Sequence, residues 1–310
     1  MERDGRHFLY QHYLDTLADL KPDFFLMENV PGLLTAKING KETFQQILKD
    51  FGAIEPAYEV APSYEEYRRN PRDYLVNSYW YGVPQKRTRV ILIGYRRELA
   101  RTHPRIKTVF RRLLAMKIDN VLTVTDAIGD LPELSPGDGK DGWFGAYKEK
   151  PLTTYQSWAH RRSPGVCNHR ARTHMASDLE RYRFFIGHHL NGNRRATLVN
   201  LLEERPNLTP DHDHLDKFID QFKVQLWNRP STTVMAHIAK DGHYYIHPDI
   251  HQCRSFTVRE AARCQSFPDN FRFEGPRTEQ FKQVGNAVPP RMAYAIAKVL
   301  MHELEEIYRI

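Results

Sequence analysis

The stretch DFFLMENVPGLL, residues 23–34, decides how the first part of this 310-residue sequence folds. Four large apolar residues, 24–27, lead directly into Glu28 and Asn29, and a Pro-Gly pair follows after one more residue. A continuous apolar run bounded by turn residues predicts a strand that is buried on both faces. The acid and the amide then lie at the carboxyl end of that strand, where open α/β sheets bind ligands. Glu28 is therefore either a satisfied structural group or a catalytic one, and this stretch alone leaves both open.

Helical patterns flank this strand on both sides. Residues 6–20 carry apolar side chains at helical spacing, and residues 44–51 do so before a glycine that suits a helix end. A second apolar run at residues 90–93, which Gly94 would stop, predicts another buried strand. Helix, strand and helix at short spacing favour a layered α/β fold.

Polar side chains alternate just before the second apolar run. Gln85, Arg87 and Arg89 are separated by Lys86 and Thr88. Because alternate side chains of an extended chain point the same way, one face would carry an amide and two guanidiniums. Such donors suit a base edge or a carboxylate. The alternative is a polar strand entrance whose arginine heads reach solvent.

The middle of the chain, residues 101–253, differs in character. Prolines, histidines and arginines are scattered through it and its apolar runs are short, which predicts long loops. Within it, a strand at residues 232–238 and a partner at 243–246 are predicted to form a hairpin around Asp241-Gly242.

Regular structure resumes at Arg254. Thr257 and Glu260 have the spacing of a capping box, which predicts a helix over residues 258–266. After a Gly-Asn turn at residues 285–286, a pair of prolines and an apolar stripe predict a long final helix.

The charge of the chain favours a polyanionic partner. It has 45 Lys and Arg against 38 Asp and Glu, a formal net charge of +7. Such an excess also fits an ordinary solvated surface, but a group of arginines gathers around aromatic residues, which is typical of nucleic-acid binding. These arginines are Arg161, Arg162, Arg170, Arg172, Arg181, Arg183, Arg194 and Arg195.

The remaining composition excludes several classes of protein. Three cysteines are too few for a disulfide framework, which predicts a reducing cytosol and a cytoplasmic protein. No apolar run reaches membrane-spanning length and the N-terminus lacks a signal-peptide pattern, so we expect no membrane association. An Asp-His-Asp-His run at residues 211–214 and Cys167 near His169 lack the paired spacing of zinc ligands, so we predict no metal site.

Four motifs in a fixed order make this sequence resemble the DNA (cytosine-5) methyltransferase family. They are ENV at residues 28–30, YGVPQKRTR at 81–89, RSFTVREAARCQSFPD at 254–269 and QVGNAV at 283–288. The resemblance covers residues 23–97 and 254–297, and the variable stretch between them lies where the family keeps its target-recognition domain.

The resemblance implies an α/β fold. A partial Rossmann-like sheet of an S-adenosylmethionine-dependent methyltransferase would be joined to a smaller, irregular target-recognition domain. Residues 1–100 would form the second half of the catalytic domain, residues 101–253 the DNA-binding target-recognition domain, and residues 254–310 the return to the catalytic domain.

The resemblance also implies roles for the residues of the motifs. In this family a cysteine thiolate adds to C6 of cytosine, S-adenosylmethionine supplies the methyl group to C5, and an acid shares a proton with N3. Glu28 is the candidate for that acid and Arg89 for the donor to cytosine O2. Arg87 and Gln85 would position the nucleophile loop, and Asn29 would brace the end of the strand. The cytosine must leave the duplex to reach these groups, which implies base flipping.

The same resemblance implies the cofactor and the partner. Asn286, Ala287 and Val288, in the closing motif, are the candidates for binding S-adenosylmethionine. The partner would be double-stranded DNA with a specific target sequence, in the bacterial cytosol or nucleoid. The family's commonest bacterial role is in restriction–modification.

Two motifs of the family do not occur in the sequence: the glycine-rich F-x-G-x-G segment that cradles the cofactor and the Pro-Cys-Gln loop that carries the nucleophile. None of Cys167, Cys253 and Cys264 follows a proline, and each is expected to be a structural thiol. We therefore expect the chain to be inactive alone and to expose an uncovered sheet edge. A late start site, a separate N-terminal half or subunit with the Pro-Cys-Gln loop, and a non-catalytic DNA-binding remnant all stay open as explanations.

Overall fold

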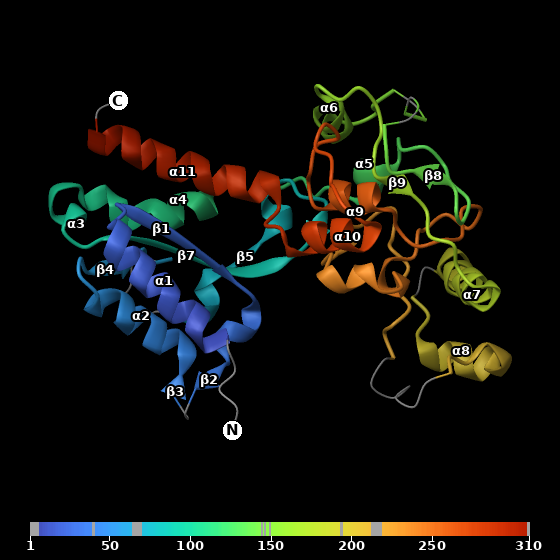
Figure 1. The fold of residues 1–310 in the computed structure, drawn as a ribbon, viewed down its shortest axis with the longest axis horizontal. Helices are drawn as coiled ribbons and strands as arrows, with labels where there is room; N and C mark the ends of the chain where they lie inside the picture. The colour runs from blue at the N-terminus through green and yellow to red at the C-terminus, as the bar shows by residue number, and fades with distance from the viewer. Residues whose placement is uncertain are drawn as a thin grey trace. The chain divides into compact units, whose positions relative to one another are not determined.

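Two compact units, each built from segments far apart in the sequence, make up the computed structural model (Figure 1). Unit 1 comprises Met1–Tyr81, Thr88–Asp119 and Ala293–Ile310, and unit 2 comprises Gly82–Arg87 and Asn120–Met292. The functional domains predicted at residues 1–100, 101–253 and 254–310 divide the chain differently and stay a prediction. The residues that the structure describes are 6–38, 41–63, 70–143, 145, 147–148, 150–192, 195–211 and 219–308.

Unit 1 is built on a four-stranded sheet. β7 (Thr88–Arg96) lies between β1 (Phe24–Asn29) and β4 (Tyr58–Val60), and β5 (Leu75–Asn77) also pairs with it. Each of these pairs is antiparallel, so β1 and β4 run in the same direction. A helix, α2 (Thr43–Ala53), separates those two strands along the chain, which confirms the predicted α/β class.

The buried strand predicted at residues 90–93 is confirmed, since each of these residues is fully buried in β7. The strand does not stop at Gly94 but continues to Arg96. Gly94 lies opposite Phe25 of β1 in the register of the sheet. A Cβ at position 94 would lie 2.0 Å from the Phe25 ring. That ring is itself held by Phe51 and Tyr58, at centroid distances of 4.4 and 5.5 Å, so glycine is needed for packing here.

The prediction that β1 is buried on both faces is wrong. Only Phe25 is buried in this strand, whereas Leu26 is 40% exposed. β7 pairs with one edge of β1, and no strand within the described residues pairs with the other edge. An apolar run therefore identified the strand but not whether other elements cover it, and the uncovered sheet edge that we expected from the missing motifs stays a prediction.

Helices pack on the sheet of unit 1 through aromatic residues. α1 (Arg6–Leu20) and α2 meet β1 around Phe25, where Tyr13 lies 6.0 Å from that ring. α4 (Val109–Ala115) contributes Phe110, whose ring lies 5.3 Å from that of Tyr74. Its Arg112 pairs with Glu303 of the long final helix, α11 (Pro290–Tyr308), which confirms the predicted C-terminal helix. The short elements are α3 (Leu99–Thr102), β2 (Lys37–Ile38) and β3 (Lys41–Glu42).

Unit 2 is largely irregular, as the sequence predicted. Its strands are two residues long and form two pairs: β6 (Gln85–Lys86) with β10 (Ser231–Thr232), and β8 (Gly139–Lys140) with β9 (His169–Arg170). Its helices are α5 (Val124–Ile128), α6 (Thr154–His160), α7 (Ala176–Gly192), α8 (Leu198–Glu204), α9 (Val258–Cys264) and α10 (Arg277–Asn286). None of the described helices in either unit is long and apolar enough to cross a membrane.

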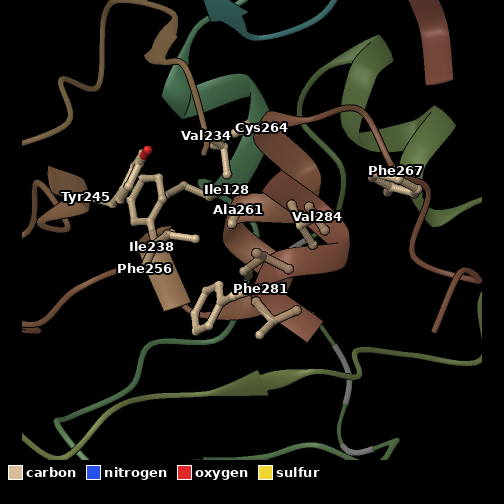
Figure 2. Close-up of a cluster of buried hydrophobic side chains, with 14 of the residues drawn as sticks. Ile128, Val234, Ile238, Tyr245, Phe256, Ala261, Cys264, Phe267, Phe281 and Val284 are labelled. Atoms are coloured by element: carbon tan, nitrogen blue, oxygen red, sulfur yellow. The ribbon is translucent and has the colours of Figure 1, made fainter. Parts of the chain in front are cut away.

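Helix α9 lies at the centre of unit 2, and every one of its residues is buried. The predicted capping box is confirmed, because the Thr257 side chain accepts from Glu260 N while the Glu260 side chain accepts from Thr257 N. Figure 2 shows the apolar cluster around this helix, with Phe281 and Val284 of α10 among its members.

The hairpin predicted at residues 232–238 and 243–246 is wrong. β10 covers only the start of the first segment and pairs in parallel with β6, and the rest forms 3-10 turns. The Tyr245 hydroxyl explains the difference, because it donates to Thr233 O (2.8 Å) and accepts from Met235 N (3.0 Å). A buried side chain thus replaces the partner strand.

The turn predicted at residues 285–286 is also wrong, since both residues end α10. A Cβ on Gly285 would lie 2.3 Å from Ala236 N, so the missing side chain lets α10 pack directly on another backbone segment.

Candidate active site

Glu28 and Arg89 form an ion pair at the carboxyl end of β1. Arg89 Nε lies 2.7 Å from Glu28 Oε1, and Arg89 Nη1 donates to Thr88 O at 2.8 Å. The two side chains are only 28% and 12% exposed. Burial lowers the pKa of Arg89, and the Glu28 carboxylate opposes that shift. Oε2 of Glu28 and Nη2 of Arg89 have no partner among the described residues, so each partner keeps one group for a ligand.

Asn29 follows the acid and fixes the backbone. Its Oδ1 accepts from Val30 N at 2.8 Å, which holds the chain as it leaves β1. The bracing role that the resemblance implied for Asn29 stays a prediction.

Gln85 and Arg87 belong to unit 2 and are both buried there. Gln85 Oε1 accepts from Val234 N (3.0 Å), and its Nε2 donates to Gln265 Oε1 (2.6 Å). Arg87 donates from Nη1 to Val234 O (2.8 Å) and from Nη2 to Gly285 O (3.1 Å). Both side chains thus hold backbone segments in place.

The closing motif is connected to this group through Gln265. Its Nε2 donates to Val284 O (2.9 Å) and Ala287 O (3.0 Å) while its Oε1 accepts from Gln85. The structure therefore brings the sequence-predicted residues together in two sets. One set, in unit 1, holds Glu28, Asn29 and Arg89, and the other, in unit 2, holds Gln85, Arg87 and the 286–288 segment.

Residues 286–288 have the chemistry of a partial cofactor wall. Asn286 is exposed, and the described residues include no partner for its amide, whereas Ala287 and Val288 are half-buried. A free amide beside apolar surface fits a ligand that has both polar and apolar parts, as S-adenosylmethionine has.

The three cysteines are all buried, with exposed fractions of 0% for Cys167, 5% for Cys253 and 0% for Cys264. Burial raises the pKa of each thiol, to about 12 for Cys264. In Cys167 this effect of burial outweighs the nearby Arg259 guanidinium, whose Nη2 lies 3.0 Å from the sulfur. A nucleophilic cysteine needs an accessible thiolate, and none of these three offers one.

A buried charge network in α9 was missed in the sequence. Arg263 contacts Asp269 through Nε and Nη2, both at 2.6 Å, and Asp130 through Nη1 and Nη2, both at 3.1 Å. All three side chains are fully buried. The sequence shows Arg263 six residues before Asp269, in a helix with small apolar residues. It does not show that Asp130, more than a hundred residues earlier in the chain, contacts the same arginine.

A second buried network surrounds Glu260. Arg254 binds both of its carboxylate oxygens at 2.7 Å, and His247 Nε2 lies 3.6 Å from Oε1. Burial alone would raise the pKa of Glu260, but Arg254 and the neighbouring histidines hold it below its ordinary value. His169 is held by Thr257 Oγ1 and Pro132 O, each at 2.8 Å. Burial lowers the pKa of His169 to about 4 and that of His247 to about 3.

Because burial lowers the pKa of His169 and His247, we expect the free energy of unfolding of the protein to fall in mild acid. The unfolded chain protonates them as the pH falls below their ordinary pKa of 6.5, whereas the folded protein keeps them neutral to about pH 4 for His169 and about pH 3 for His247. The unfolded state binds more protons in this window, so the free energy of unfolding falls by about 1.4 kcal/mol per pH unit for each histidine. The ion pairs of Glu260 add to the loss at lower pH, as protonation of the acid removes them.

Urea unfolding between pH 7 and 5 measures this dependence. His169→Gln removes one proton-binding group, so the slope of the free energy of unfolding against pH should decrease by about 1.4 kcal/mol per pH unit. His251→Gln, at an exposed histidine of the same unit, should leave the slope unchanged. A slope that is the same in all three proteins would show that folding does not change the protonation of His169.

No cluster of three or more His, Cys, Asp or Glu side chains with metal-binding geometry occurs within the described ranges. Residues 212–214 of the acid–histidine run lie outside them.

Comparisons with known proteins agree on one family. The model of the family described as C-5 cytosine-specific DNA methylase matches residues 1–302. The type II methyltransferase M.Bpa9945I of Bacillus paralicheniformis is 43% identical over 303 residues, which cover 96% of this chain and 64% of the relative. The type II methyltransferase M.XorII of Xanthomonas oryzae pv. oryzae is 30% identical over 314 residues, 98% of this chain and 64% of the relative. This chain thus spans less than two thirds of the length of either relative.

A solved structure supports the fold. A prophage-encoded protein of E. coli, described as a DNA modification methyltransferase, superposes with a TM-score of 0.64 over 97% of this chain and 75% of that one. Its sequence is 24% identical, so the likeness is one of fold.

Proposed function

The chain belongs to the C-5 cytosine-specific DNA methylase family, and from this membership we propose that it serves methyl transfer from S-adenosylmethionine to C5 of a flipped cytosine in a specific duplex sequence. A restriction–modification setting fits its similarity to type II methyltransferases. The observation that carries the proposal is the half-buried Glu28–Arg89 pair at the carboxyl end of β1.

The pair has the groups that a cytosine requires. Addition of a thiolate at C6 moves electron density toward N3, where a carboxyl group that shares a proton stabilises the adduct. Glu28 has Oε2 uncommitted for this contact while Arg89 fixes Oε1. Arg89 Nη2 is the corresponding donor to O2. We assign Glu28 to N3 and Arg89 to O2.

The residues of unit 2 are assigned separate roles. Gln85 and Arg87 fasten the backbone at Val234 and Gly285, so we assign them positioning roles. Asn286, Ala287 and Val288 are assigned to the wall that binds S-adenosylmethionine. When bound, that cofactor supplies the methyl group.

The thiol that attacks C6 is proposed to come from outside these 310 residues. The burial and raised pKa of Cys167, Cys253 and Cys264 support this proposal. A segment with the Pro-Cys-Gln loop, encoded upstream in frame or by an adjacent gene, would supply it.

Transfer of labelled methyl groups from S-adenosylmethionine to duplex DNA tests the proposal. We expect no transfer by the chain as it stands, and transfer once the segment with the Pro-Cys-Gln loop is present. Transfer by the chain alone that disappears in Cys167→Ser, Cys253→Ser or Cys264→Ser would identify an internal nucleophile and contradict our assignment.

A second candidate function is DNA binding without catalysis, which the burial of all three thiols also favours. In that case the chain together with the segment that carries the Pro-Cys-Gln loop would bind DNA but transfer no methyl groups. Binding would also be insensitive to Glu28→Gln and Arg89→Ala.

A further inference from the structure

An open hollow of about 280 Å³ on unit 2 has the lining of a nucleotide site. Its wall is formed by Trp158, Arg161, Arg162, Pro268 and Asn270. None of these residues belongs to the two sets described above.

The first wall of the hollow is the end of helix α6. A capping box from Thr153 to Gln156 starts this helix, and Arg161 N donates to Trp158 O where it ends. Arg162 then adopts φ = 60°, a left-handed conformation that turns the chain away from the helix direction. Two consecutive arginines are thereby presented beside one half-buried indole.

The second wall is tied to the first through the backbone. Asp269 N donates to Ala159 O at 2.9 Å, and the Asp269 carboxylate is held by Arg263 at 2.6 Å. Pro268 and Asn270 flank this fixed aspartate. The buried charge network therefore sets the distance between the two walls, so the hollow is formed without a ligand.

The indole of Trp158 is itself held in place. The guanidinium of Arg291 lies 5.1 Å from its centroid, and the ring of Tyr155 lies 5.3 Å from it. The rest of the side chain packs against the apolar core of unit 2. Because these contacts already fix the indole ring, it loses little conformational freedom when a flat ligand packs on its exposed part.

The charges of the hollow are positive and uncompensated. Arg161 and Arg162 are both exposed, and neither forms an ion pair with any residue the structure describes. Guanidinium groups bind phosphate oxygens in bidentate fashion, and an indole stacks on any base. The Asn270 amide adds donors and an acceptor that match the edge of a base.

We propose that this hollow binds one unpaired nucleotide of the DNA substrate, with its base on Trp158, its edge at Asn270 and its phosphate at Arg161 and Arg162. The inference rests on the proposed function for the presence of DNA, and it adds a nucleotide outside the Glu28–Arg89 site. Base flipping leaves unpaired nucleotides in a duplex, which is the kind of ligand that such a site would hold.

Fluorescence anisotropy with two labelled duplexes of the same sequence, one fully paired and one with a single bulged adenosine, tests the inference. We expect the parent chain to bind the bulged duplex more tightly. Trp158→Leu should weaken that binding about tenfold, the size of one lost base–aromatic contact, and leave the salt slope unchanged. Arg161→Gln with Arg162→Gln should lower the slope of log K against log salt by about 0.9, the contribution of the one phosphate that the two arginines share.

The control is Arg205→Gln, at an exposed arginine of unit 2 that is remote in sequence from the hollow. We expect its binding to match that of the parent. The arginine variants lie on the surface, so they report on the site even if Trp158→Leu perturbs folding, which thermal melting would reveal.

Three outcomes separate the hypotheses. If the variants bind the bulged duplex as the parent does, the inference is wrong and the proposed function stands. Equal losses on both duplexes would show that the hollow contacts paired DNA, which also overturns the assignment of an unpaired nucleotide. If the parent binds neither duplex, both the inference and the DNA-binding part of the proposed function are wrong.

Discussion

Arg263→Met should destabilise unit 2 by about 3–5 kcal/mol, the cost of breaking a buried ion pair by removing one partner. Arg263 neutralises two fully buried carboxylates, Asp130 and Asp269, and donates to each of them twice. Burial on its own would lower the pKa of Arg263, but the two acids hold it above its ordinary value. The arginine is therefore charged at every accessible pH, and its loss leaves two acids without their main partner.

Urea unfolding followed by tryptophan fluorescence measures this effect. Three of the four tryptophans, Trp143, Trp158 and Trp227, belong to unit 2, so the signal is weighted toward the affected part. Arg205→Met, which removes an exposed arginine from the same unit, should change stability by less than about 0.5 kcal/mol.

A triple variant distinguishes lost charge compensation from lost packing. Arg263→Met combined with Asp130→Asn and Asp269→Asn leaves no carboxylate in the network of Arg263, so it should recover much of the stability that the single variant loses. A triple variant as unstable as the single one would show that the shape of the arginine, and not its charge, stabilises α9.

The elements that the sequence predicted correctly are those with local signals. The capping box of Thr257 and Glu260, the apolar stripe of the last helix and the apolar run at residues 90–93 each lie within one segment. These signals depend on neighbours along the chain, so they survive in any tertiary context.

The elements that were wrong depend on distant partners. Residues 232–246 do not form a hairpin because the Tyr245 hydroxyl takes the hydrogen bonds of a partner strand. The apolar run of β1 is partly exposed because, within the described residues, full burial is confined to Phe25, whereas Leu26 on the opposite face is 40% exposed. No pattern within either segment reports on these contacts.

The candidate site was predictable in part for the same reason. The acid at the end of β1 and the arginine motif were visible as residue types, and the structure brings Glu28 and Arg89 within 2.7 Å. We expected the side chains of Gln85, Arg87 and Arg89 to point to one face of a single strand. This is wrong, because β6 ends at Lys86, β7 begins at Thr88 and Arg87 lies between them. Arg87 instead binds carbonyl groups of residues 147 and 198 positions away along the chain.

Glu28→Gln should lower methyl transfer by about 10²- to 10⁴-fold in the completed enzyme, the usual contribution of a positioned acid. The amide keeps the shape of the side chain, and its oxygen still accepts from Arg89 Nε, but it has no acidic proton to share with N3. Because the pair is partly exposed, its loss should change stability by no more than about 1 kcal/mol. A large fall in kcat with an unchanged melting temperature is therefore the expected result.

Glu59→Gln is the matched control for Glu28→Gln. Glu59 lies in β4 of the same sheet, and its Oε1 contacts Arg97 Nε at 3.1 Å in the same manner as Glu28 contacts Arg89. Both substitutions remove a carboxylate that contacts an arginine Nε through Oε1, although the Arg97–Glu59 pair is the more exposed of the two, and only Glu28 lies at the proposed cytosine contact. Methyl transfer by Glu59→Gln should stay within about twofold of the parent, since a surface ion pair away from the site contributes little. If both variants lose activity equally, the effect comes from the sheet and Glu28 is not the acid that contacts N3.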